Sequence, residues 1–371
     1  MTPKHSNSSW QCGLLIALCV ILAIFLIGLC VVTGLVNRTL GYINQIDPDN
    51  EVTLSPSEAE DIGFGDGTET IDPDSTDDII HIDDITMPSY TEGNNQGGST
   101  TVVPTPQLEV ITGDHLVNIL LVGQDRREGE KRQRSDSMIL VTFNKSTNEI
   151  TLTSFMRDQY VQIPGYKNNK LNAAYEIGGM KLLTKTLKAN FGVVVDGIIE
   201  VDFSGFIDVI DLLGGVDIKL TEAEATHLTE ATSGHWQLQA GYQRLTGEQA
   251  LAYARLRSID TDYRRAERQR KVVTAVINSA KSLSLGQLLS MMDKILPMVS
   301  TNLSNTQIMS YASDLFPMLT SANLQTTRIP VEGTFEEGIV QVRDNLTAWF
   351  QYNIDFYANN QYLNEIFKKA N

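Results

Sequence analysis

The chain has 371 residues, of which 42% are hydrophobic and 20% are charged, and its formal net charge is −16. This apolar content excludes a chain that is disordered throughout, and the length is enough for about two domains with a large core. Taken alone, the net charge argues against nucleic acid or another acidic polymer as a partner, because like charges repel.

The charge is distributed very unevenly along the sequence. Residues 1–40 contain two basic residues and no acidic one, residues 41–114 contain 17 acidic residues and no Lys or Arg, and residues 115–371 contain 27 basic and 28 acidic residues. Nearly all of the net charge therefore belongs to one segment, and the C-terminal part is close to neutral. Net charge consequently excludes little about the partners of that part.

Residues 13–36 form a run of 24 residues without a charge. As a helix this run would be about 36 Å long, more than the roughly 30 Å of a membrane's hydrocarbon core. It is too long for the apolar region of a cleaved signal peptide, and a buried core helix seldom stays apolar on every side for so many turns. We predict a transmembrane signal anchor over residues 13–36, preceded by a short cytoplasmic N-terminus at residues 1–12.

Residues 37–112 have the composition of a tether. Asp, Glu, Ser, Thr, Pro and Gly occur there in clusters, and the apolar stretches between them are too short to bury a face. Such a segment repels itself and extends, so we predict an acidic disordered linker; a docking role for the acidic patch is the alternative. The chain's three cysteines all precede this linker, which excludes disulfides and cysteine catalysis in the part that follows.

Residues 113–371 are predicted to form one folded domain. Apolar runs ended by turn residues indicate strands, and Thr-x-x-Glu and Thr-x-x-Gln at Thr221 and Thr246 are capping boxes that open helices. Strands alternating with helices predict an α/β domain with a central mixed β-sheet and helices on both faces. The predicted strands are residues 115–122, 138–143, 150–155, 193–203, 216–220 and 325–331, and the predicted helices include residues 172–191, 204–213, 262–282, 284–297, 305–319 and 343–357.

The common phosphate, dinucleotide, zinc-protease and serine-hydrolase motifs are absent, and what remains is arginine beside aspartate. The first such cluster follows the first strand and contains Asp125, Arg127, Arg134 and Asp136. Carboxylates in a loop at the end of a strand are suited to Mg²⁺, which takes few protein ligands and often binds phosphate oxygens as well. The alternative is a solvated, charge-balanced loop.

Two further clusters carry the same chemistry. Arg157 and Asp158 follow the third strand, and seven basic residues occupy the 17 positions from Arg255 to Lys271. Within this last segment, Arg265 and Arg268 share a helix face with two valines, so their guanidinium groups point inward and need partners. Those partners are either carboxylates or a phosphate, whose oxygens a guanidinium binds bidentately.

Together the three clusters indicate a site for two linked phosphates with Mg²⁺, that is, for a pyrophosphate. Nucleic acid is disfavoured as the anion because the basic residues lie in short segments without a broad stripe or a reading motif.

The same segments resemble the LytR-CpsA-Psr family of cell-wall glycopolymer ligases, most closely over residues 114–282. In chain order, the matching stretches are Asn118 to Arg127, Arg134 to Leu140, Ser154 to Asp158, Lys170 to Tyr175, Val201 to Phe206, Leu213 to Val216, Leu245 to Arg257, and Asp262 to Gln269. Each stretch is weak by itself, whereas eight in order after one membrane anchor are specific.

The resemblance implies a membrane-anchored bacterial phosphotransferase whose domain faces away from the cytoplasm. It would transfer a teichoic-acid-like or capsular polymer from a polyprenyl (undecaprenyl) pyrophosphate carrier in the membrane lipid to peptidoglycan, forming a phosphodiester. Asp125 and Asp136 match the Mg²⁺ positions, and with Arg157, Arg255 and Arg257 they form the implied catalytic set. The implied pyrophosphate-binding residues are Arg127, Arg134, Arg157, Arg255, Arg257, Arg265, Arg268 and Gln269.

Two other functions remain open at this stage. One is a regulatory protein that binds polyprenyl phosphate without turnover, and the other is a pyrophosphatase that hydrolyses the lipid carrier. Two intact carboxylates at the Mg²⁺ positions favour catalysis, and product analysis separates transfer from hydrolysis. The glycopolymer itself carries no readable signal in the sequence, and Asp158 is one candidate for the general base.

Overall fold

The computed structural model describes residues 43–61, 80–85, 87, 108–124, 132, 134–201, 203–256, 262–281, 294, 299–343 and 346–368. The predicted signal anchor at residues 13–36 lies outside these residues, as does most of the predicted helix at residues 284–297. Within the part of the chain that is described, no helix has the length and apolar character needed to cross a bilayer.

The centre of the fold is a seven-stranded mixed sheet with the strand order β1-β11-β8-β3-β4-β5-β12. Strands β3 (Leu116–Gln124), β4 (Ser135–Asn144) and β5 (Glu149–Phe155) form an antiparallel meander. On its two sides, β8 (Gly197–Val201) runs parallel to β3, and β12 (Asn323–Ile329) runs parallel to β5. The outer strands are β11 (Val299–Thr301) and β1 (Asn44–Gln45).

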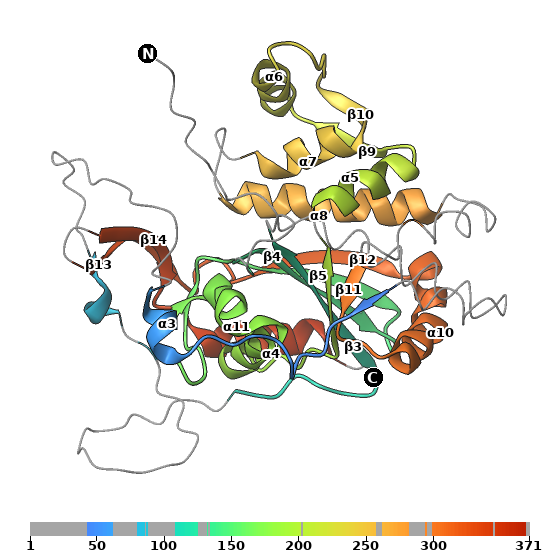
Figure 1. The fold of residues 1–371 in the computed structure, drawn as a ribbon. Helices are drawn as coiled ribbons and strands as arrows, with labels where there is room; N and C mark the ends of the chain where they lie inside the picture. The colour runs from blue at the N-terminus through green and yellow to red at the C-terminus, as the bar shows by residue number, and fades with distance from the viewer. Residues whose placement is uncertain are drawn as a thin grey trace, which may run out of the picture.

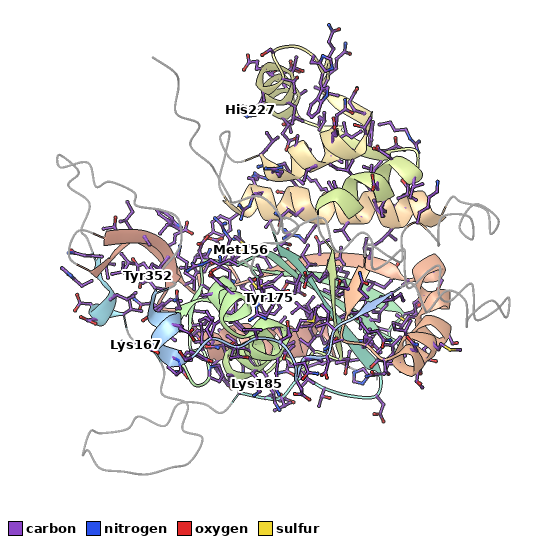
Figure 2. All side chains as sticks on the ribbon, viewed as in Figure 1. Met156, Lys167, Tyr175, Lys185, His227 and Tyr352 are labelled. Atoms are coloured by element: carbon purple, nitrogen blue, oxygen red, sulfur yellow. The ribbon has the colours of Figure 1, made fainter. Side chains whose placement is uncertain are left out.

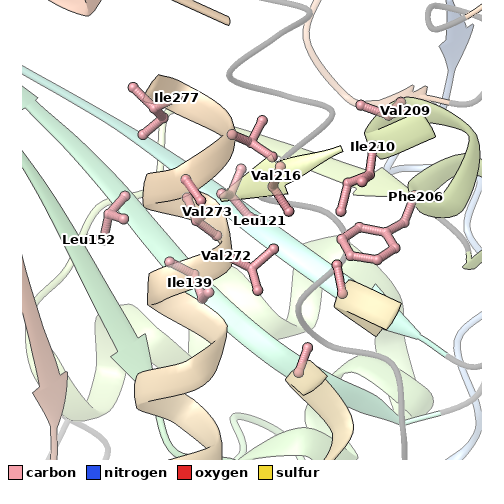
Figure 3. Packing of buried hydrophobic residues seen from close by; sticks show 14 of the residues in the cluster. Leu121, Ile139, Leu152, Phe206, Val209, Ile210, Val216, Val272, Val273 and Ile277 are labelled. Carbon is pink, nitrogen blue, oxygen red and sulfur yellow. The ribbon is translucent and has the colours of Figure 1, made fainter. Parts of the chain in front are cut away.

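Helices cover both faces of this sheet, as Figure 1 shows. On one face, α5 (Phe203–Leu212), α7 (Gly247–Arg255), α8 (Asp262–Lys281) and α10 (Asn305–Ser321) pack on alternate strand residues such as Leu121 and Ile139 (Figure 3). On the other, α4 (Leu171–Phe191) and α11 (Phe356–Ile366) pack on the intervening residues, including Leu120 and Leu140. The predicted architecture of a mixed sheet between two helical layers is confirmed.

Smaller elements extend this domain at its ends. β9 (Val216–Leu220) and β10 (Gly241–Leu245) form a hairpin-like pair beside α6 (Glu222–Ala231), and β6 (Tyr160–Val161) pairs with β7 (Asn169–Lys170). β13 (Glu336–Arg343) and β14 (Leu346–Tyr352) form a second sheet with β2 (Ile80–His81), next to the single-turn helix η2 (Ile82–Asp84). In Figure 1 this second sheet lies at the opposite side of the molecule from α10.

The predicted helix at residues 343–357 is wrong, because the middle of this segment, Leu346–Tyr352, is the strand β14. It is rich in β-branched and aromatic residues, which suit a strand, and β13 pairs with it along its whole length. Phe350 is fully buried whereas Trp349 is 41% exposed, so the side chains alternate between two faces as in a half-buried strand.

Helices α6 and α7 begin where the sequence predicts, and α4 is interrupted at its glycine pair. The predicted capping boxes are present at the first residues of α6 and α7, where the Thr221 and Thr246 hydroxyls accept hydrogen bonds from Glu224 N and Gln249 N. Helix α4 is interrupted by Gly178 and Gly179, whose backbone leaves the helical conformation. The glycine pair therefore marks a kink rather than the middle of a straight helix.

Part of the segment predicted to be a linker packs on the domain, which differs from the expected tether. Residues 43–61 cross the α4 face after adding β1 to the main sheet, and Leu54 N donates to Ile177 O at 2.9 Å. At the kink of α4, the carboxylate of Glu51 accepts a hydrogen bond from Met180 N at 2.9 Å. The segment continues into α3 (Pro56–Asp61), where Ala59 joins the core. Specific partners on the domain, which composition cannot reveal, order these residues.

Gly179 allows residues 43–61 to approach the kink of α4, and its replacement by Ala is expected to disrupt this contact. Its φ of +61° suits glycine alone, and a Cβ atom there would overlap the Glu51 carboxylate. We expect Gly179→Ala to cost about 2–3 kcal/mol and to speed amide exchange at Leu54 and Met180. Gly165→Ala is the matched control, since Gly165 has a φ of +85° with open space around its Cβ position. Equal exchange rates at Leu54 in both variants would contradict the expectation.

Candidate functional site

The most concentrated buried charge in the described structure surrounds Asp158, just beyond the end of β5. The guanidinium of Arg157 donates from Nε to Asp158 Oδ2 at 3.1 Å, and Lys170 Nζ donates to Asp158 Oδ1 at 2.8 Å. The Lys170 side chain is only 5% exposed and stands over the ring of Phe350 at 5.0 Å. The turn after β5 and the start of α4 thus meet around one carboxylate.

Two more arginines act on this group from other parts of the sequence. The positive charge of Arg265, on α8, helps to lower the pKa of Asp158, and the charge of Arg134, just before β4, acts on Lys170. We call Arg134, Arg157, Asp158, Lys170 and Arg265 the Asp158 cluster. It joins residues from four separate segments, and three of its arginines are sequence-predicted pyrophosphate ligands.

The pKa values in the cluster follow from burial and pairing. Burial favours the neutral form of Asp158, but Arg157 and Lys170 outweigh it and hold the pKa of this carboxyl well below its ordinary value of 3.8. Burial lowers the pKa of Lys170, while Asp158 acts in the opposite direction. Asp158 is therefore ionised at neutral pH and engaged with two cations, which makes it a poor proton acceptor for general-base catalysis.

Contacts within the described residues bring four basic and two acidic side chains together. Arg134 also binds Glu176 on α4, from Nε to Oε2 at 2.9 Å, so the residues joined by these contacts supply four positive charges and two carboxylates. This arrangement suits an oxyanion with several acceptor oxygens, as a pyrophosphate has.

Sequence reasoning gave no separate role to Lys170, which belongs to the cluster, or to Asn172, which lies beside it. Asn172 N donates to Arg157 O at 3.3 Å, and both polar atoms of the Asn172 side chain are buried with no hydrogen-bond partner among the described residues. Both residues stand in the Lys170 to Tyr175 stretch of the family resemblance, which was the available signal. Figure 2 labels Tyr175, on α4, and Met156, which directly follows β5.

The remaining predicted ligands on α7 and α8 are placed only in part. Arg255 is the last residue of α7 and is half-buried, and Gln269 on α8 is 7% exposed. Arg257 and Arg127 lie outside the described residues, so their predicted roles stay predictions.

Arg268 has a carboxylate and a backbone carbonyl as neighbours in the structure, and its predicted role in pyrophosphate binding stays a prediction. Its side chain is almost completely buried, its Nη1 lies 3.4 Å from Glu224 Oε1, and its Nη2 donates to Leu256 O at 2.6 Å. An inward-pointing arginine thus has a carboxylate partner here, the other outcome that the sequence left open. Because Leu256 directly follows Arg255, these contacts hold the end of α7 at Arg255.

The predicted Mg²⁺ carboxylates fall at the edge of what the structure describes. Asp125 lies outside it, and of Asp136 only the backbone is described. The register between β3 and β4 shifts there, with Gly123 opposite Ser137 and Gln124 opposite Ser135, so Asp136 is the extra residue of a β-bulge. Bulges re-aim side chains beside active sites, and this one lies across from the residue that precedes Asp125. The described side chains contain no group of three or more potential metal ligands.

A sequence model of the LytR_cpsA_psr family matches residues 87–354, which is most of the chain and contains the whole cluster. The chain belongs to the LytR-CpsA-Psr family. The resemblance inferred from eight short stretches is thereby confirmed.

Relatives and solved structures agree with this membership. The chain is 36% identical over 214 residues to the polyisoprenyl-teichoic acid–peptidoglycan teichoic acid transferase TagT of Bacillus subtilis (strain 168), a match covering 56% of this chain and 66% of that protein. It is 36% identical over 232 residues to TagU of Bacillus anthracis (strain CDC 684 / NRRL 3495), covering 61% and 72%. The match thus spans about two thirds of each relative's length.

Two solved structures share the fold. The structure of TagT bound to LIIa-WTA has a TM-score of 0.55 with 29% identity and covers 68% of this chain and 90% of that chain. The structure of YwtF (TagT) with bound octaprenyl pyrophosphate lipid has a TM-score of 0.51 with 28% identity and the same coverage.

Proposed function

We propose that this protein transfers an anionic or capsular glycopolymer from a polyprenyl pyrophosphate carrier to peptidoglycan, with formation of a phosphodiester bond. The observation that carries the proposal is the Asp158 cluster, in which four cations from four separate segments gather around one buried carboxylate. The relatives are named teichoic acid transferases, and one solved relative holds a polyprenyl pyrophosphate lipid.

The chemistry proposed for the site is phosphoryl transfer by positioning and charge neutralisation. Guanidinium groups of Arg157 and Arg265 would bind oxygens of the pyrophosphate, and the negative charge that develops on the departing polyprenyl phosphate would be stabilised by the same donors. Asp158 would hold Arg157 and Lys170 in place rather than accept a proton. Arg255 and Gln269 would complete the binding surface from the α7 and α8 side.

Mg²⁺ is part of this proposal, with Asp125 and Asp136 as the residues that would hold it. The β-bulge at Asp136, beside the strand end that leads to Asp125, and the preference of Mg²⁺ for carboxylate oxygens support this assignment. When bound, the ion would offset negative charge on the phosphate oxygens.

The cellular placement follows from the sequence and remains part of the proposal. A single-pass anchor at residues 13–36 would hold the domain on the extracytoplasmic face of a bacterial cell membrane, where lipid-linked polymer and peptidoglycan meet. Because residues 43–61 pack on the domain, the chain between the anchor and the first ordered strand is short. The domain would therefore stay close to the membrane surface that delivers its lipid substrate.

Replacing Arg255 by Ala tests the function and the site together. We expect the full chain in lipid vesicles, given a polyprenyl-pyrophosphate-linked donor, peptidoglycan and Mg²⁺, to lose about 100-fold or more of its transfer rate. Arg244→Ala is the control, because the Arg244 side chain is 55% exposed and pairs with an exposed carboxylate. Full activity of Arg255→Ala would overturn the site assignment. Free polymer phosphate as the product would indicate a pyrophosphatase, and no turnover by the unmodified protein would indicate a regulatory binder.

A further inference from the structure

Arg270 is a half-buried arginine on α8 to which the proposed pyrophosphate site gives no role. Its Nη1 donates to the hydroxyl of Ser154, on β5, at 2.9 Å, and its Nε is buried with no hydrogen-bond partner among the described residues. Burial lowers the pKa of Arg270 to about 10; Glu267 acts against this and the charge of Arg328 adds to it. A guanidinium that keeps a buried N–H without an acceptor, beside another cation, would gain from a further anion.

Arg328 brings that second cation to the same place. It lies on β12 directly opposite Ser154 in the sheet, and its guanidinium carbon stands 4.0 Å from the centre of the Tyr263 ring. The Arg328 side chain is 22% exposed, whereas its carboxylate partner Glu332 is 80% exposed. An ion pair with so exposed a partner is weak, and an incoming anion can replace it.

Arg270 and Arg328, which we call the arginine pair, are connected to the Asp158 cluster and lie near an edge of the main sheet. Gln351 Nε2 donates to the Tyr263 hydroxyl at 2.9 Å, and Gln351 N donates to Asp158 O at 2.9 Å, so one residue contacts both places. Ser154 precedes Arg157 by three residues, which is about 10 Å along an extended strand. β12 is one of the two edge strands of the main sheet, and the Arg328 side chain is partly exposed there.

We propose that Arg270 and Arg328 form a second oxyanion subsite that binds a phosphodiester group of the transferred glycopolymer, next to the pyrophosphate. This proposal rests on the proposed function and names its substrate class, a polymer with phosphate in its chain. A polymer attached to the pyrophosphate has to leave the cluster toward solvent, and the sheet edge at β12 offers such a way out. Two guanidinium groups supply the paired donors that phosphate oxygens accept.

Binding of a soluble fragment tests the subsite without turnover. The probe is a synthetic trimer of glycerol phosphodiesters, which has neither lipid nor pyrophosphate, titrated calorimetrically into the full chain in detergent. We expect Arg270→Gln and Arg328→Gln each to weaken binding several-fold and the double variant to weaken it at least tenfold. Arg264→Gln removes one charge from the same helix at a side chain that is 65% exposed, and it should change the affinity less than twofold. Absence of trimer binding to the unmodified protein, or equal losses in all three single variants, overturns the subsite.

A second arm separates donor from acceptor and guards against misfolding. A muramyl peptide, whose carboxylates belong to the acceptor, should bind the variants and the unmodified protein equally; a loss confined to this ligand overturns the assignment to the polymer. Since Arg270 forms no ion pair within the described part of the chain, Arg270→Gln should not lower the melting temperature. A lowered melting temperature together with normal trimer binding by Arg328→Gln would assign the arginines a structural role.

Transfer assays distinguish failure of the subsite from failure of the proposed function. With the same lipid pyrophosphate, Arg328→Gln should lower kcat/KM several-fold for a donor chain that contains phosphodiesters and leave it unchanged for an uncharged chain. Equal losses with both donors overturn the subsite while transfer itself stands. If the unmodified protein binds the trimer but transfers neither donor, the proposed function fails and the oxyanion subsite remains.

Discussion

Replacing Asp158 by Asn is expected to lower the free energy of unfolding by about 3 kcal/mol, as measured by denaturant titration. The substitution keeps the size of the side chain but removes the one charge that both Arg157 and Lys170 contact. Two cations would then remain buried without this carboxylate, in surroundings where an uncompensated charge is very unfavourable.

An exposed carboxylate provides the control for this substitution. Asp217 pairs with Arg244 at 3.5 Å, but its side chain is 61% exposed, so Asp217→Asn should change the stability by less than about 1 kcal/mol. Similar losses of stability in Asp158→Asn and Asp217→Asn would show that the buried contacts of Asp158 stabilise the fold no more than an exposed ion pair does.

Comparison of the unmodified protein with Asp158→Asn also predicts how the stability depends on pH. Because the folded-state pKa of Asp158 lies below its ordinary value of 3.8, the ionised carboxylate stabilises the fold above that pH. Its contribution is lost as the pH falls through the folded-state pKa. The stability difference between the unmodified protein and Asp158→Asn should thus be constant near neutral pH and shrink below about pH 4. A difference that grows on acidification would contradict the ionised assignment.

Replacing Arg157 by Ala is expected to reduce the transfer rate by about 10²–10³-fold, as removal of one preorganised charge-stabilising donor does elsewhere. Arg157 is the guanidinium that Asp158 orients directly, and its side chain is only 7% exposed. Asp158 keeps Lys170 as its partner in this variant, so the protein should still fold.

Two further variants make this result specific. Arg157→Lys retains the charge but loses the planar pair of donors, so it should recover only part of the rate. Arg264→Gln, at an exposed position on α8, should transfer at the normal rate. A loss below tenfold in Arg157→Ala would remove Arg157 from the proposed binding surface.

Much of the architecture could be predicted from local patterns. The apolar runs of β3, β4 and β5 and the capping boxes of α6 and α7 are contained in a few consecutive residues, and the structure has them where they were expected. β14 was mistaken for a helix because its identity as a strand depends on pairing with β13. The packing of residues 43–61 was missed because their acidic composition hides the specific contacts of Glu51 and Leu54.

Some residues of the candidate site could likewise be predicted from the sequence, and others could not. Arg134, Arg157 and Arg265 were found because arginine beside aspartate at strand and helix ends is visible in the sequence, and the structure brings all three to one cluster. Lys170 had no such signal of its own. Arg268 was grouped with them by helical spacing, yet spacing gives only the face of a helix and not the partner that the face meets.

The sequence by itself determined the family of this protein and the residue types proposed for its site, since both depend on which residue types occur and in what order. The tertiary structure alone decided which charges meet. Asp158 contacts Lys170, which is 12 residues later in the sequence, and the charge of Arg265, more than 100 residues later, lowers its pKa. Arg268 is instead bound to Glu224. The energy of a buried charge depends on the partners within a few ångströms and on the water excluded around it, and only the folded chain fixes both.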